Sequence, residues 1–244
     1  MNIEMLKNTF KKYAENYDMN DKAIMLKYLH SLRVMDLCYN IAQDNNLNKE
    51  DTEISILIGL LHDYGRFEQW QNYKTYSDKI SIDHADLAVK KLFDDNEIVG
   101  YCTNKDYYEI IYDAIKYHNK YLYPDNLKDR NKMFTKIIRD ADKLDIFYLM
   151  TIKDISLKVD KKIISKSIEE KFYKNESLNY NDINNNNEKI LLKFAMIFDL
   201  NFDYSFNYIK DNLFIEKIFN QLEEKDRFEP YFEHVKKYVK ERTR

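Results

Sequence analysis

Histidine and aspartate side chains recur in this sequence where a helix end or a helix face could direct them toward one point. Imidazole and carboxylate groups are the ligands that Mn, Fe, Co, Ni and Zn ions take in proteins. Each histidine alone would be an ordinary core or surface residue, but a metal would explain them as a group. The candidates are His30, His62, Asp63, His84, His118 and Asp142. The remaining histidine, His234, is expected to be an ordinary residue of a polar tail.

The adjacent pair His62 and Asp63 has the strongest chemical implication. The pair ends the most apolar helical segment, so both side chains can turn toward one centre if the helix unwinds there. The two oxygens of Asp63 could then bridge two ions, and ions about 3.5–4 Å apart can clamp the attacking and leaving oxygens of a phosphoryl group. Gly65 is expected to let the chain bend away after this pair.

Hydrophobic periodicity predicts helices as the elements that position these residues. With only 3 glycines and 2 prolines in 244 residues, the chain lacks the turn residues that an all-β fold needs. The sequence therefore predicts an all-α fold. The predicted helices cover 22–42, 51–62, 83–94, 106–119, 131–151, 188–198, 205–223 and 230–242. Asn48 and Asp51 are both candidates to cap the helix over 51–62.

The chain is predicted to have two parts. Residues 1–155 contain all six candidate ligands and form the expected core, and residues 156–244 form a helical C-terminal extension. An asparagine run at 184–187 is expected to be a loop, because asparagine favours turns over helix interiors.

Composition excludes several classes of protein. A content of 44% hydrophobic and 33% charged residues is typical of a globular domain. The net charge of −3 disfavours nucleic acid as a partner, and no apolar stretch is long enough to cross a membrane. Cys38 and Cys102 form neither a disulfide framework nor a CxxC zinc pair. Without a signal-peptide pattern, a cytoplasmic location is expected.

Five ordered motifs in residues 24–150 resemble those of the HD-domain superfamily of metal-dependent phosphohydrolases. They are HSLRV (30–34), LLHDYGR (60–66), DHADLA (83–88), IKYHNKY (115–121) and RDADKLDI (139–146). The resemblance implies an HD-domain helical bundle followed by the C-terminal extension. It also implies a first metal held by His30, His62, Asp63 and Asp142, and a second held by Asp63, His84 and His118. Asp140 is an alternative to Asp142, and in a one-metal site His84 and His118 would contact phosphate directly.

The chemistry implied by the resemblance is hydrolysis of a nucleotide or another small phosphoester through metal-activated water. Asp63 would be central to catalysis, with Arg66 and Lys143 stabilising charge on the phosphate, although both could also be ordinary ion-pair residues. The cofactors would be one or two Mn, Fe, Co, Ni or Zn ions, with Mg allowed at one site. An HD-fold di-iron oxygenase, a non-catalytic nucleotide-binding module and a metal-free helical scaffold are the alternatives. The sequence is also compatible with a homodimer.

Overall fold

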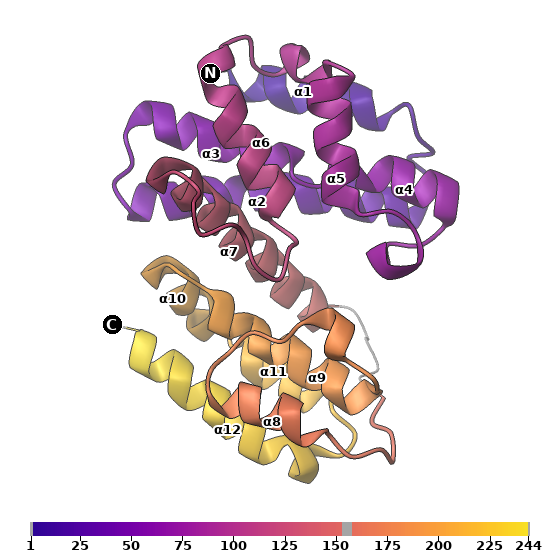
Figure 1. Cartoon of the computed structure of the whole chain (residues 1–244), viewed down its shortest axis with the longest axis vertical. Helices are drawn as coiled ribbons and strands as arrows, with labels where there is room; N and C mark the ends of the chain where they lie inside the picture. Colours follow the sequence, from indigo (N-terminus) through magenta and orange to yellow (C-terminus); the bar gives the residue numbers. More distant parts are fainter. Residues whose placement is uncertain (1, 153–157, 244) are drawn as a thin grey trace. The chain divides into compact units, whose positions relative to one another are not determined.

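A computed structural model describes residues 2–152 and 158–243 of the chain, and this part consists of helices and loops without a strand. The all-α prediction is confirmed. The chain divides into two compact units, Met1–Asp142 and Lys143–Arg244, and the division falls within helix α7 (Figure 1). The boundary predicted between residues 155 and 156 lies outside the described residues.

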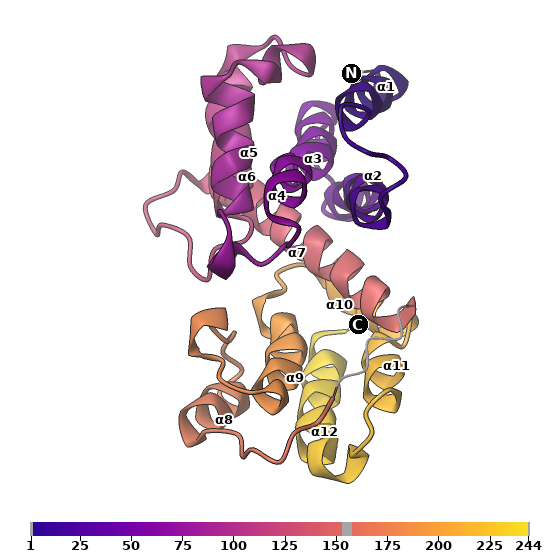
Figure 2. The same cartoon turned by 90° about the vertical axis from the view of Figure 1, so that its right-hand side faces the viewer.

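The α-helices of the first unit include those that carry the candidate ligands. In chain order they are α1 (Ile3–Ala14), α2 (Lys22–Asp44), α3 (Lys49–Leu61), α4 (Arg66–Tyr73), α5 (His84–Val89), α6 (Tyr108–Tyr117) and the first part of α7 (Asp129–Ile152). α2 packs along α3, and α5 lies beside α6 (Figure 2). Gly59 permits the first of these contacts, because a Cβ atom there would lie 2.8 Å from the Cα atom of Met35.

Side-chain caps fix where the ligand-bearing helices begin. The Asp21 carboxylate accepts a hydrogen bond from the Ala23 amide at 2.8 Å and starts α2. Asn48, not Asp51, caps α3, with its side-chain oxygen 2.9 Å from the Asp51 amide. Asp83 caps α5 and so makes His84 the first residue of that helix.

The second unit contains the end of α7 and a further set of helices. They are α8 (Lys166–Tyr173), α9 (Asn186–Ala195), α10 (Asp203–Asp211), α11 (Phe214–Asn220) and α12 (Lys225–Arg242). The prediction of one helix over 205–223 is wrong. Asn212 closes α10 by donating its side-chain amide to the Tyr208 carbonyl at 2.9 Å, and Leu213 takes a left-handed conformation with φ 52°.

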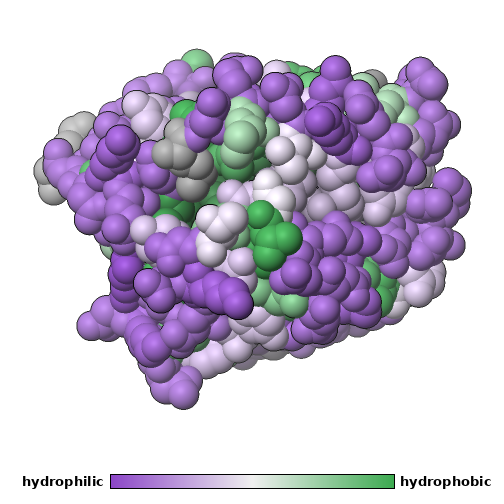
Figure 3. All heavy atoms as spheres, turned by 90° about the horizontal axis from the view of Figure 1, so that it is seen from above, coloured by the Kyte–Doolittle hydropathy of each residue, from purple (hydrophilic) through white to green (hydrophobic). Residues whose placement is uncertain are grey.

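The face of the molecule seen from above is largely polar (Figure 3). Figure 3 shows one face on which hydrophilic residues predominate and hydrophobic residues form small areas between them. Within the described residues, no helix is both long and apolar enough to cross a membrane.

Candidate metal centre

Five elements of the first unit bring the six candidate ligands together. His30 lies in the middle of α2, His62 caps the C-terminus of α3, and Asp63 begins the turn that follows. His84 opens α5, His118 caps α6, and Asp142 projects from α7. His30, His62, Asp63, His84 and His118 are each no more than 3% exposed. The Asp142 side chain is 19% exposed.

Four side chains surround a first position. The Nε2 atom of His30 lies 3.1 Å from Nε2 of His62, 3.1 Å from Oδ1 of Asp142 and 3.4 Å from Oδ2 of Asp63. The Nε2 atom of His62 lies 3.6 Å from the same Asp63 oxygen and 3.7 Å from the Asp142 oxygen.

Three side chains surround a second position next to the first. The Nε2 atoms of His84 and His118 lie 3.0 Å apart. Oδ1 of Asp63 lies 3.2 Å from the His84 nitrogen and 3.8 Å from the His118 nitrogen. Asp63 therefore directs one carboxylate oxygen to each position.

These separations fit metal coordination. Donor atoms about 2.1 Å from an ion lie about 3.4 Å apart in a tetrahedron and about 3.0 Å apart as neighbours in an octahedron. The separations between donors at both positions, 3.0–3.8 Å, cover these values. Nitrogen and oxygen donors at this spacing could hold a metal ion at each position.

Hydrogen bonds at Nδ1 fix the tautomers of three of the imidazoles. Nδ1 of His62 lies 2.8 Å from the Gly59 carbonyl oxygen, and Nδ1 of His118 lies 2.7 Å from the Ile115 carbonyl oxygen. A carbonyl oxygen only accepts, so both Nδ1 atoms carry the proton. Nδ1 of His84 lies 2.7 Å from the carboxylate of Asp78 and is a donor in the same way. The Nε2 lone pairs of all three are then available to a metal.

The atoms that face the second position are therefore all hydrogen-bond acceptors, and none of them carries a proton. Burial is the largest effect lowering the pKa of His84 and that of His118, so both imidazoles are neutral near pH 7. Their Nε2 lone pairs face each other, and the nearest further group is a carboxylate oxygen of Asp63. Three buried acceptors that converge in this way repel one another unless a cation lies among them.

The two ligand carboxylates are held in their ionised form. Burial would raise the pKa of Asp63, but Lys27, His62 and Arg66 outweigh it and hold that pKa well below the usual range. For Asp142, burial is likewise outweighed, here by the facing His30 and His62, and its pKa is also well below the usual range. Ionised carboxylates and neutral imidazoles are the forms that bind metal.

An outer layer of polar side chains orients the second position. Asp78, in a short 3-10 turn (Asp78–Ile80), accepts from Nδ1 of His84 through one oxygen. Its other oxygen accepts from Arg66 at 3.0 Å and from Gln69 at 2.8 Å. The amide of Asn119 lies 3.2 Å from the Asp78 oxygen that faces His84. Sequence reasoning missed Asp78, because residues 74–83 have no helical pattern to assign its side chain a direction.

Replacing Asp78 by alanine is expected to weaken metal binding at the second position alone. Loss of a carboxylate that orients a metal-binding histidine typically lowers metal affinity by about 10–100-fold, and we expect a loss of that size here. Calorimetric titration of the metal-free protein would show one weakened and one unchanged binding event. Asp95→Ala, which removes an exposed partner of Lys90, is the control and should leave both events unchanged. Equal weakening of both events would contradict the assignment.

Sequence reasoning also missed two basic residues at the centre. The Lys27 ammonium lies 2.7 Å from Oδ2 of Asp63. The buried Arg139 donates Nη1 to the carbonyls of Tyr117 and Lys120 at 3.0 and 2.5 Å, and so holds the end of α6 that carries His118. One signal for Lys27 exists in the sequence, since it precedes His30 by three residues and shares its helix face.

Gly65 serves a different purpose from the one predicted. Its φ of −72° is open to any residue, so the chain does not need glycine there in order to bend. A Cβ atom at Gly65 would instead lie 2.3 Å from the carbonyl oxygen of His84 and 2.8 Å from the amide nitrogen of Ala88. The absence of a side chain lets α5 approach the turn after Asp63, which places His84 beside that carboxylate.

The two basic residues predicted to contact phosphate lie in different surroundings. Arg66 lies beside the second position, with Nε 3.4 Å from Asp63 and Nη1 2.7 Å from the Tyr76 carbonyl. Lys143 belongs to the second unit, where its ammonium forms a 2.6 Å ion pair with Asp199. The structure thus brings Arg66 to the ligands, and a contact between Lys143 and phosphate stays a prediction.

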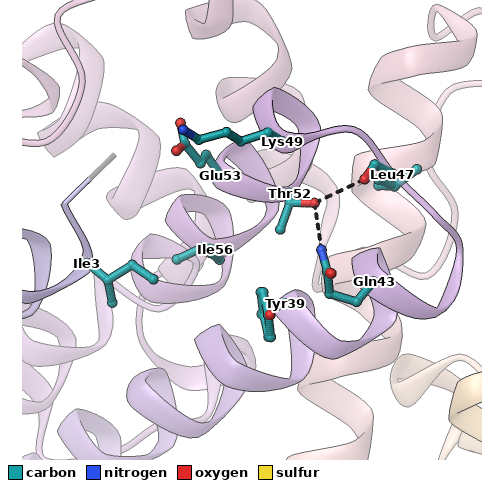
Figure 4. Close-up of a pocket in the computed structure, with 8 residues that line it drawn as sticks. All are labelled: Ile3, Tyr39, Gln43, Leu47, Lys49, Thr52, Glu53 and Ile56. Atoms are coloured by element: carbon teal, nitrogen blue, oxygen red, sulfur yellow. Dashed lines mark hydrogen bonds between the residues drawn. The ribbon is translucent and has the colours of Figure 1, made fainter.

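A groove of about 420 Å³ lies elsewhere on the first unit (Figure 4). Its lining residues are Ile3, Tyr39, Gln43, Leu47, Lys49, Thr52, Glu53 and Ile56. Tyr39 follows His30 by nine residues, or about 14 Å along the axis of α2. With no histidine and one carboxylate, the groove lacks a set of metal ligands.

Residues 28–146 match the family model of the HD domain. This range contains all six candidate ligands and ends just after Asp142. No curated protein and no solved structure matches the chain significantly.

Proposed function

We propose that the protein hydrolyses a nucleotide or another small phosphoester, because residues 28–146 match the family model of the HD domain, which is typical of metal-dependent phosphohydrolases. The observation that supports this most directly is the orientation of Asp63. Each of its oxygens faces a separate set of histidine nitrogens, and a carboxylate that joins two ions in this way is suited to phosphoryl chemistry.

The charge of the site supports an anionic substrate. Asp63, Asp78 and Asp142 bring three negative charges to the centre, and Lys27 and Arg66 bring two positive charges. Two divalent ions would turn this slightly negative balance into a surplus of positive charge. A phosphoester, together with hydroxide, would offset that surplus in a largely buried site where uncompensated charge is costly.

In this proposal, most of the chain's residues act by holding and orienting. His30, His62 and Asp142 would hold the first ion, and His84 and His118 would hold the second, with Asp63 between them. Such ions lower the pKa of a bound water and offset charge on phosphate oxygens. Arg66 fixes Asp63 and Asp78 relative to each other, and its guanidinium adds positive charge beside the second position.

Metal dependence tests the proposal. Protein stripped with a chelator should release no phosphate or nitrophenol from p-nitrophenyl phosphate, bis-p-nitrophenyl phosphate or a panel of nucleotides. Adding back Mn, Co, Ni, Fe or Zn ions, alone or with Mg, should restore hydrolysis of at least one of these substrates. Protein that binds two ions and still hydrolyses none would count against a phosphohydrolase. Iron as the bound metal, with oxygen uptake, would instead indicate the di-iron oxygenase.

A further inference from the structure

Lys27 occupies a particular place at the centre. It lies on α2 one turn before His30, and its ammonium is 2.7 Å from Oδ2 of Asp63. That oxygen is the one directed at the first metal position, 3.4 Å from Nε2 of His30. Among the described residues, Lys27 forms this one ion pair.

The Lys27 ammonium and a metal ion at the first position would compete for the negative charge of Asp63. A divalent ion at the first position would draw on Oδ2 of Asp63 and would repel an ammonium group close to that oxygen. The Lys27 side chain is 16% exposed and has a flexible four-carbon stem, so its ammonium can turn outward without movement of α2.

An aromatic wall would keep the displaced ammonium close to the site. The Lys27 ammonium lies 5.5 Å from the centroid of the Tyr76 ring. Tyr76 is fixed by a 2.7 Å hydrogen bond from its hydroxyl to the Ala23 carbonyl and by the Trp70 ring at 4.9 Å. Trp70 is held in turn by a 2.7 Å hydrogen bond to Asp21. The ammonium therefore has a rigid surface along which to shift.

Arg66 is less able to make such a change. Its guanidinium lies 5.6 Å from the same Tyr76 ring, but Nη1 is already within 3.0 Å of Gln69, the Tyr76 carbonyl and Asp78. Lys27 can exchange its single carboxylate partner for a phosphate oxygen at little cost, because both are charge-assisted hydrogen bonds.

We propose that Lys27, which pairs with Asp63, is a phosphate-binding residue of this centre and would contact a phosphoryl oxygen of the substrate when metal and substrate are bound. The inference rests on the proposed function, since it assumes a phosphorylated ligand beside the first position.

The test measures phosphate binding, not turnover. Wild-type protein, Lys27→Gln and Lys27→Arg would be loaded with Mn, and inorganic phosphate would be titrated into each by calorimetry. Lys27→Gln is expected to bind phosphate about 10–100-fold more weakly, the loss typical for a hydrogen bond to a charged group, with metal content unchanged. Lys27→Arg keeps the charge and should recover most of the affinity.

Lys91→Gln is the matched control. Lys91 is 14% exposed, pairs with Glu68 at 2.9 Å and lies 5.9 Å from the Tyr13 ring, so it resembles Lys27 in burial, charge and surroundings. Phosphate affinity should not change in this variant.

The outcomes separate this inference from the proposed function. Unchanged phosphate affinity in Lys27→Gln, loss of metal from it, or absence of phosphate binding by wild-type protein would each overturn the role of Lys27. If wild-type protein hydrolyses phosphoesters while Lys27→Gln binds phosphate normally, only the inference fails. If Lys27→Gln loses phosphate affinity but no variant or wild-type protein hydrolyses a phosphoester, Lys27 keeps its role and the hydrolase proposal fails.

Discussion

Asp63→Asn is expected to abolish binding at both metal positions and to lower phosphohydrolase activity by roughly a thousand-fold or more. The carboxylate presents Oδ2 to His30 and His62 and Oδ1 to His84 and His118, so one substitution affects both sets of ligands. An asparagine keeps the volume of the side chain but lacks the negative charge that a divalent ion requires. Metal per chain by plasma mass spectrometry and initial hydrolysis rates would measure the two effects.

Two controls show whether this loss is specific. The helical circular dichroism of Asp63→Asn should match that of wild-type protein, because the residue follows the end of α3 and asparagine leaves its backbone hydrogen bond to Arg66 in place. His234→Ala should retain full metal content, since His234 bonds Asn175 at 2.8 Å among aromatic rings of the second unit. Normal metal content in Asp63→Asn would contradict the assigned ligands.

Gly65→Ala is expected to destabilise the protein by about 3 kcal/mol or more, the range of a severe overpacking mutation. Its Cβ atom would collide with backbone, at 2.3 Å from the His84 oxygen and 2.8 Å from the Ala88 nitrogen, and backbone cannot rotate away as a side chain can. α5 would have to move outward and carry His84 away from Asp63. Urea unfolding would give the stability, and metal titration the accompanying loss at the second position.

Gly100→Ala is the matched substitution. A Cβ atom at Gly100 would have Thr9 as its nearest neighbour, at 3.8 Å, which is an ordinary contact. Replacing glycine by alanine at such a site usually stabilises by about 0.4–1 kcal/mol through the unfolded chain. The two variants should therefore shift the urea midpoint in opposite directions. Equal midpoints would show that α5 does not depend on the missing side chain at residue 65.

Apolar periodicity predicts the three longest helices that carry candidate ligands, but it did not predict α1, α4 or α8. α2, α3 and α7 have stripes of apolar residues over three or more turns and begin and end close to the predicted residues. α4 and α8 have only eight residues each, too few to establish a period, and were not predicted. The break between α10 and α11 depends on a left-handed Leu213, a residue type that gives no warning of such a turn.

The clustering of the candidate ligands was easier to predict than their surroundings. Histidine and aspartate are conspicuous at helix ends, and the structure places His30, His62, Asp63 and Asp142 about one point and His84 and His118 about another. The partners of these ligands depend on side-chain distances between segments far apart in sequence. Lys27 lies 36 residues from Asp63, and Arg139 lies 21 residues from His118, so periodicity carries no information about either contact.

Asp63 is expected to join two metal positions, and the metal content of wild-type protein would show whether it does. Protein purified without chelator or an affinity metal would be analysed by plasma mass spectrometry, before and after incubation with Mn, Co or Ni and removal of the excess. The arrangement of donors predicts about two divalent transition-metal ions per chain. Protein that contains no such metal, and takes up none on incubation, would contradict it.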